Sequence, residues 1–224
     1  MTMAVSDVHP KPHSNSQKIF GLILMVMAWF GVLLQLWISL NLAHPNGKII
    51  VAGLVKYFGF FTVITNIFVA LTLSMPAFAP ASRIGRFFAR PQVLACAAAN
   101  IAFVGLAYHI LLRDLWNPVG LQWLADQILH YVTPLAFCTY WLLTRPKTVS
   151  LPWWSPLAWS SYPLLYFLYS LIRGAVLGIY PYPFIDATSI GYAMALRNAF
   201  GLWFAFLLLA WLFLFFASLG VRRK

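Results

Sequence analysis

The sequence predicts an all-α integral membrane protein with six transmembrane helices and both termini in the cytoplasm. Hydrophobic residues make up 62% of the chain and charged residues only 8%, far from the balance of a soluble domain. Apolar segments of about 20 residues recur along the whole length, each long enough to cross a bilayer. Basic residues gather in alternate loops and in the tails, a pattern that orients membrane proteins. The net charge of +11 is therefore assigned to topology rather than to nucleic-acid binding.

Six helices are expected from the apolar segments: Ile19–Leu42, Ile49–Met75, Pro91–Leu112, Leu121–Leu143, Pro156–Tyr180 and Ile190–Ala217. Residues 1–17 are polar and are predicted to form a disordered tail, residues 18–218 the six-helix membrane domain, and residues 219–224 a basic C-terminal tail. The first helix exceeds the apolar core of a signal peptide, so we expect it to remain in the mature protein. The small-residue run Ala95–Asn100 predicts close helix packing.

The topology follows from the positions of the basic residues. Ten of the 15 Lys and Arg residues fall on one side of the expected bundle: Lys11, Lys18, Arg83, Arg86, Arg90, Arg145, Lys147, Arg222, Arg223 and Lys224. The opposite loops hold only Lys48 and Arg113. The positive-inside rule places the larger set, and with it both termini, in the cytoplasm.

The chain contains two cysteines, Cys96 and Cys138, both within expected helices. They lie in the half of the membrane that faces the reducing cytoplasm, so we expect free thiols rather than a disulfide. Because this pair and the scattered histidines lack the spacing of metal ligands, neither a metal site nor a cofactor is expected.

Three polar side chains, Thr62, Thr65 and Asn66, interrupt the apolar stretch GFFTVITNIF in the second expected helix. With a rotation of about 100° per residue, they share one face of that helix. Polar groups within a bilayer are energetically expensive, so these positions indicate function. Counted from the cytoplasmic ends of their helices, Thr62 and His130 each lie 13 residues deep, roughly 20 Å from the inner face. We therefore expect both at one level, in the outer half of the bilayer.

A threonine hydroxyl at the level of a histidine indicates nucleophilic catalysis. His130 can remove the proton of Thr62, and Asp126, one helical turn earlier, can fix the tautomer of the imidazole. The resulting oxyanion needs hydrogen-bond donors, for which Asn66 is the nearest candidate. Thr65 offers a second hydroxyl one turn from Thr62, so the sequence leaves the choice of nucleophile open. The alternative is that these groups only bond to the backbone or join helices.

Four basic side chains are expected near the outer headgroups: Lys56, His109, Arg173 and Arg197. Their positions correspond to about 25–30 Å from the inner face. Such a cationic ring can bind the carboxylate or phosphate head of a lipid-like substrate, with an ester group near Thr62. The alternative is that these side chains extend to the membrane surface without binding a ligand.

Three segments resemble a known family: KYFGFFTVITN in the second helix, LADQILHYVTP in the fourth, and YPYPFID after the fifth. They are similar to the six-helix androgen-induced membrane protein family, which includes threonine hydrolases of fatty acid esters of hydroxy fatty acids. The chain resembles uncharacterised bacterial members more closely, which implies a location in the bacterial cytoplasmic membrane. The resemblance places the nucleophile on Thr62 and the base on His130. Asp126, and the spacing of four residues from His130 to Pro134, depart from the animal hydrolases.

The leading function from the sequence is a membrane-embedded hydrolase that cleaves an ester bond of a lipid or fatty-acid-like substrate. A transporter, channel or receptor-like module that binds an anionic amphiphile is the main alternative, and a structural or assembly partner is a third. Transport needs polar residues across the whole membrane, whereas the inner half offers mainly Asn100. The hydrolase therefore ranks first.

Overall fold

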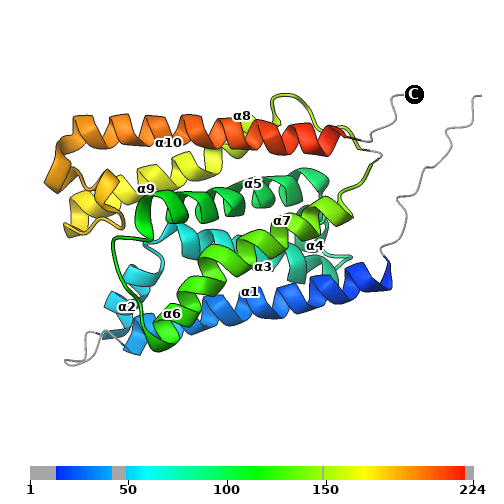
Figure 1. Ribbon diagram of the computed structural model, residues 1–224, viewed down its shortest axis with the longest axis horizontal. Coiled ribbons are helices and arrows are strands. Elements are labelled where there is room, and N and C mark those ends of the chain that lie inside the picture. The colour runs from blue at the N-terminus through cyan, green and yellow to red at the C-terminus, as the bar shows by residue number, and fades with distance from the viewer. Residues whose placement is uncertain (1–13, 42–48, 148, 220–224) are drawn as a thin grey trace, which may run out of the picture.

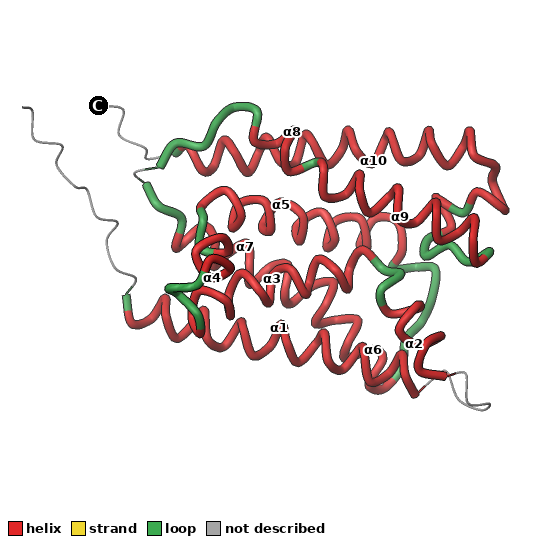
Figure 2. The backbone as a smooth tube through the Cα atoms, turned by 180° about the vertical axis from the view of Figure 1, so that it is seen from behind, coloured by secondary structure: helices red, strands yellow, loops and turns green. Residues whose placement is uncertain are grey.

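The computed structural model describes residues 14–41, 49–147 and 149–219, and the regular secondary structure in these ranges is entirely helical (Figures 1 and 2). The all-α class is thereby confirmed. Four helices of the described chain are long and apolar enough to cross a membrane: Asn15–Asn41, Phe61–Phe78, Pro91–Leu112 and Ala187–Ser218. The sequence predicted six such spans, and the remaining two are helical but interrupted.

The elements run in chain order as α1 Asn15–Asn41, α2 Ile49–Tyr57, α3 Phe61–Phe78, α4 Arg83–Phe88, α5 Pro91–Ala107, η1 Tyr108–Leu112, α6 Gly120–Gln127, η2 Ile128–Val132, α7 Thr133–Thr144, α8 Ser155–Trp159, α9 Ser161–Leu177, η3 Pro183–Ile185 and α10 Ala187–Ser218. The fourth expected helix corresponds to α6, η2 and α7, which follow one another directly. The fifth corresponds to α8 and α9, of which α9 has 17 residues. Residues 15–17, predicted as tail, begin α1, and most of both predicted tails lies outside the described residues.

The second expected helix is broken into α2 and α3. Phe60, between them, has an extended backbone with φ −96° and ψ 130°, so the helix cannot continue through it. The break places Thr62 in the first turn of α3 rather than in the middle of a long helix.

Side chains of α9 donate hydrogen bonds to the backbone carbonyls that this break leaves without helical partners. Polar backbone groups within a membrane need protein partners, because lipid offers none. The Tyr166 hydroxyl donates to the Gly59 carbonyl at 2.8 Å, and the Arg173 guanidinium donates to the Val55 carbonyl at 3.3 Å. The irregular connection between α2 and α3 is therefore stabilised from α9.

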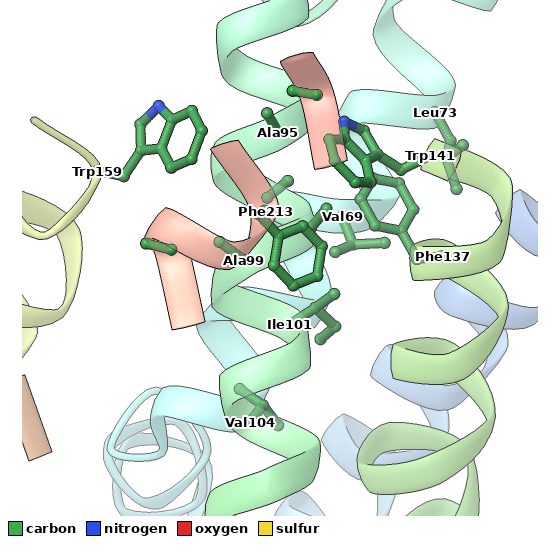
Figure 3. Close-up of a cluster of buried hydrophobic side chains, with 14 of the residues drawn as sticks. Val69, Leu73, Ala95, Ala99, Ile101, Val104, Phe137, Trp141, Trp159 and Phe213 are labelled. Carbon is green, nitrogen blue, oxygen red and sulfur yellow. The ribbon is translucent and has the colours of Figure 1, made fainter. Parts of the chain in front are cut away.

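The centre of the bundle is formed by α3 and α5. α5 packs against α3, α7 and α10, and Ala97, Ala98 and Ala99 on it are 0% exposed. Small side chains allow helices to approach closely, as the sequence predicts for this run. Larger apolar side chains fill the surrounding core in Figure 3: Val69, Ile101, Phe137, Trp141 and Phe213.

The two outer faces of the bundle are formed by α1 and α10 (Figure 1). Both helices bury only about a quarter of their most apolar stretch, 28% for α1 and 22% for α10. On α1 the exposed large apolar side chains include Leu22, Val26, Phe30, Leu33 and Trp37. A continuous apolar surface of this length is what a lipid-facing helix presents.

The described basic residues of the larger set gather at one end of the bundle. α4, with its two arginines, lies at the end where α1 begins and where α7 and α10 finish (Figure 1). Gln17 donates to the Leu143 carbonyl at 2.8 Å, and Arg145 donates to the Leu219 carbonyl at 3.1 Å. These bonds join the first helix and the last helix to the end of α7.

α10 begins at a cap and bends soon afterwards. The Asp186 carboxylate accepts hydrogen bonds from the backbone N–H groups of Thr188 at 3.0 Å and Ser189 at 3.3 Å. Hydrogen bonds from Thr188 and then Ser189 hold the pKa of the Asp186 carboxyl below its ordinary value. Gly191 takes φ 76° and ψ 154°, a conformation that favours glycine and interrupts the helix.

Substitution of Gly191 by Ala is expected to destabilise the protein by about 1–3 kcal/mol, because a side chain is strained in this backbone conformation. Gly201→Ala is the matched control. No heavy atom lies within 4 Å of an added Cβ at either position, but Gly201 is helical, so Ala there should be neutral or stabilising by up to about 1 kcal/mol. Denaturant unfolding in detergent measures both effects, and equal effects would contradict the strain.

Acid is expected to weaken the cap of α10. The folded pKa of Asp186 lies below the unfolded value of 3.8, so the contribution of its carboxylate is complete above that value and is lost as the pH falls through the folded pKa. The melting temperatures of wild-type and Asp186→Asn proteins should therefore differ at neutral pH, and the difference should shrink as the pH falls below 3.8. A difference that stays constant over this range would contradict the expectation.

Candidate functional site

Two adjacent π-helical turns, η1 and η2, form the base of the site. Such turns are rare and are frequent at functional sites. Pro134 contributes to the second turn: within η2 the Thr133 N–H bonds to the Ile128 carbonyl, and Pro134 has no N–H to offer the Leu129 carbonyl. The Leu129 carbonyl is thus left without a backbone donor.

Asn66 of α3 supplies the missing donor. Its Nδ2 donates to the Leu129 carbonyl at 3.1 Å and to the Thr62 carbonyl of its own helix at 2.8 Å. The side chain is fully buried, and these two bonds use both of its N–H groups. Asn66 therefore joins the first turn of α3 to η2, and its donors do not face a substrate.

Thr62 and His130 are in direct contact. His130 Nε2 lies 3.2 Å from Thr62 Oγ1. On the other side of the ring, Nδ1 lies 3.1 Å from the backbone oxygen of Asp126 and 3.1 Å from its carboxylate Oδ1. Because the backbone oxygen of Asp126 can only accept, Nδ1 carries the proton of the neutral ring, which leaves Nε2 to accept the proton of Thr62. Asp126 Oδ1 is close to Nδ1 but has no hydrogen-bond partner among the described residues. This is the order of groups that a hydroxyl nucleophile, its base and an orienting carboxylate require.

Tyr108 of η1 holds both His130 and Asp126. Its ring stacks on the imidazole with centroids 3.7 Å apart and planes inclined by 13°. Its hydroxyl donates to Asp126 Oδ2 at 2.7 Å, and the Asp126 side chain is buried. One side chain therefore fixes the plane of the imidazole and the position of the carboxylate next to it.

Tyr182, in the segment before η3, reaches the first turn of α3. The backbone N–H groups of Phe61 and Thr62 open that helix and have no carbonyl partner within it. Burial raises the pKa of the Tyr182 hydroxyl, while the Thr62 hydroxyl and the backbone N–H groups of Thr62 and Phe61 lower it. The centroid of the Tyr182 ring lies 6.0 Å from that of Phe60, the residue that precedes this turn.

Thr62 lies at the boundary of two cavities. The first, of about 410 Å³, is almost entirely apolar and lies among α5, α9 and α10, with walls that include Phe103, Phe167, Leu196 and Phe200. The second, of about 320 Å³, holds the polar groups, among them His130, Asp126, Gln35 and Gln122. Tyr108 and Tyr182 line both cavities. Thr62 therefore borders the apolar cavity and the polar cavity at once.

The structure distinguishes the two candidate nucleophiles, Thr62 and Thr65, by their contacts. Thr65 is fully buried, and its Oγ1 lies 3.5 Å from the Tyr162 hydroxyl. It lines neither of the two cavities that Thr62 lines. Of the two threonines, only Thr62 is brought to His130.

The four predicted basic residues divide into two pairs. Lys56 and Arg173 line a third cavity, of about 830 Å³, and Lys56 also lines the second cavity. His109 and Arg197 are exposed and line none of these three cavities. His109 Nδ1 lies 3.3 Å from the Tyr131 hydroxyl. The four residues therefore do not form one ring. Two of them line the third cavity, and the other two lie at the surface.

Sequence reasoning does not find Tyr108 or Tyr182. Nothing in the pattern distinguishes Tyr108 from the other aromatic residues of the expected third helix. Tyr182 stands between two prolines in the segment YPYPFID. Prolines restrict the backbone, and this restriction is the one sequence feature that marks Tyr182 as a positioned side chain.

Metal-ligating side chains do not cluster in the described part of the chain, where no three His, Cys, Asp or Glu residues are placed to hold an ion. Cys96 and Cys138 are free thiols, as the sequence predicts.

Comparison of the chain with protein-family models, with curated proteins and with solved structures found no match. The resemblance to the androgen-induced membrane protein family therefore stays an expectation from three sequence segments.

Asn66→Ala is expected to destabilise the protein more than Asn100→Ala. Both asparagines are fully buried and donate to the carbonyl four residues earlier, Thr62 at 2.8 Å and Cys96 at 2.9 Å. Only Asn66 also bonds to the Leu129 carbonyl. The difference in the free energy of unfolding, measured in detergent, should be about 1–2 kcal/mol. Equal losses would show that the π-helical turn does not depend on Asn66.

Proposed function

We propose that this protein is a membrane-embedded hydrolase that cleaves an ester bond of a lipid, with Thr62 as nucleophile and His130 as base. The 3.2 Å contact between Thr62 Oγ1 and His130 Nε2 is the observation that carries the proposal. A threonine hydroxyl is a poor nucleophile by itself, and a histidine at hydrogen-bond distance can activate it. The proton on Nδ1, directed at Asp126, gives the imidazole the tautomer that this role requires.

The reaction proceeds through an acyl–threonine ester. Thr62 Oγ1 attacks the carbonyl carbon of the substrate while its proton passes to His130 Nε2. The bond to the alcohol oxygen breaks, and His130 returns the proton to that oxygen. A water molecule then gives a proton to His130 and attacks the acyl carbon. The bond from that carbon to Thr62 Oγ1 breaks, His130 returns the proton to Oγ1, and the carboxylic acid is released. Ester and water give acid and alcohol, so the balance needs no other reactant.

The negative charge that develops on the carbonyl oxygen needs hydrogen-bond donors. We assign this role to the backbone N–H groups of Phe61 and Thr62, which have no carbonyl partner within α3, and to Tyr182, which lines both cavities together with Thr62. The N-terminal end of α3 adds the positive end of its helix dipole. Asn66, the candidate from the sequence, acts by positioning instead, since its two N–H groups are bonded to backbone carbonyls.

The two cavities that meet at Thr62 suit an ester with an apolar chain on either side. The apolar cavity accepts the acyl chain, and the second cavity accepts the alcohol part next to His130. A fatty acid ester of a hydroxy fatty acid has this form, and the resemblance of the sequence implies the same substrate class.

We further propose six spans in a bacterial cytoplasmic membrane, with both termini in the cytoplasm. The continuous helical segment 120–144 and α8 with α9 supply the two spans beyond the four long apolar helices. The basic end of the bundle supports this orientation, because positive residues are retained on the cytoplasmic side. Thr62 and His130 then lie in the outer half of the bilayer.

Thr62→Ala and His130→Ala are each expected to lower kcat for ester hydrolysis by at least about 10³-fold, because each removes one partner of the nucleophile–base pair. The measurement is the release of fatty acid from a long-chain ester of a hydroxy fatty acid by purified protein in detergent. Labelling by a fluorophosphonate probe should be lost in both variants.

Thr65→Ala is the matched control, because Thr65 is buried one turn from Thr62 but contacts Tyr162. Its hydrolysis and labelling should stay close to those of the wild type. Undiminished hydrolysis by Thr62→Ala would remove this mechanism. Lipid binding by the wild type without any hydrolysis would favour the alternative of a module that binds an anionic amphiphile.

A further inference from the structure

Arg173 is a buried cation with only neutral partners. It is 7% exposed, and its guanidinium donates to the Ile179 carbonyl at 2.7 Å and to the Val55 carbonyl at 3.3 Å. Its Nε is buried and has no hydrogen-bond partner among the described residues. Carbonyl dipoles orient a guanidinium but do not neutralise its charge, and a buried charge without a counter-ion is strongly unfavourable.

Three of the four acidic residues of the chain are engaged elsewhere. Asp126 accepts from Tyr108, Asp186 caps α10, and Asp114 pairs with Arg113 at 3.2 Å. These contacts leave Arg173 without an acidic partner in the described chain.

The fourth, Asp7, lies outside the described residues, seven positions before Ser14 at the opposite end of the bundle. Within the described chain the charge of Arg173 therefore has no counter-ion, and another molecule can supply one.

Arg173 lines the third cavity, of about 830 Å³, together with Lys56. The other walls are largely apolar and include Val51, Phe60, Leu177 and Ile179. A Cβ at Gly59 would lie 3.0 Å from Arg173 Cζ, so the glycine leaves room for the guanidinium. Two cations and apolar walls suit a molecule with an anionic head and an apolar tail.

We propose that Arg173 and Lys56 bind the anionic head group, carboxylate or phosphate, of an amphiphile. Arg173 offers a planar set of N–H donors, and the exposed Lys56 adds a second charge. Lys56, Phe60 and Pro181 line both this cavity and the one that contains Thr62. When the amphiphile is also the substrate, this head-group site determines which ester reaches Thr62. This link to the substrate rests on the proposed hydrolase function.

Ligand binding to the Thr62→Ala protein tests this site without depending on hydrolysis. Isothermal titration calorimetry in a non-ionic detergent compares laurate, dodecyl phosphate, dodecanol and inorganic phosphate. Laurate, dodecyl phosphate or both should bind at least about tenfold more tightly than dodecanol, which has the same chain without the charge. Tighter binding of laurate indicates a fatty-acid carboxylate as the natural head group, and tighter binding of dodecyl phosphate indicates a phosphate.

Three further substitutions in the same background assign the binding to named residues. Lys56→Gln, at an exposed position, should weaken binding of the preferred anion about three- to tenfold. Arg173→Gln should weaken it more than about tenfold, because the buried guanidinium supplies the stronger contacts. Arg197→Gln is the matched control, an exposed cation that lines none of the three cavities, and should leave the affinity unchanged.

Dodecanol binding as tightly as both anionic amphiphiles overturns the head-group site. So does inorganic phosphate binding as tightly as dodecyl phosphate, or an equal effect of Lys56→Gln and Arg197→Gln. Hydrolysis that survives Thr62→Ala, combined with Lys56-dependent binding of laurate, refutes Thr62 as the nucleophile and supports the head-group site.

Discussion

A backbone carbonyl that has lost its hydrogen-bond donor organises the centre of this protein. Pro134 and the π-helical turn leave the Leu129 oxygen unpaired within its own helix, and a membrane interior offers no water to replace the donor. Asn66 satisfies it across the helix interface and bonds at the same time to the Thr62 carbonyl. The contact that stabilises the packing of α3 on η2 is thus also the contact that sets Thr62 against His130.

The break between α2 and α3 is a second backbone irregularity whose polar groups bond to side chains of another helix. The break between α2 and α3 exposes carbonyls that Tyr166 and Arg173 of α9 satisfy, and the N–H groups of the first turn of α3 have no carbonyl partner within the helix. Non-helical backbone within a membrane is tolerated where protein or a cavity surrounds it. Both irregular regions of this chain border cavities, so the departures from regular helix coincide with the places where a ligand has room.

The sequence predicts features that depend only on residue spacing along one helix, such as helix bounds and the relative depth of two residues. The third expected helix, Pro91–Leu112, has the bounds of α5 and η1 together, and the equal depth counted for Thr62 and His130 corresponds to a direct contact. What depends on neighbouring helices is not predictable in this way. The break at Phe60 and the stacking of Tyr108 on His130 arise from tertiary contacts.

Arg197 illustrates the limit of counting depth. Its level expected from the sequence is close to that of Arg173, but level does not determine the direction in which a side chain leaves its helix. Arg173 turns into the bundle and is buried, whereas Arg197 is exposed. Only the packing of α9 and α10 distinguishes them.

Most walls of the apolar cavity come from a different part of the chain than the proposed nucleophile and its base. Thr62, Tyr108, Asp126 and His130 all lie within the first 130 residues, whereas most of the apolar walls belong to α9, η3 and α10. Changes in the C-terminal helices can therefore reshape the space for a hydrocarbon chain while the nucleophile and its base keep their geometry. In evolutionary terms, selectivity for chain length and the chemistry of the site are free to vary separately.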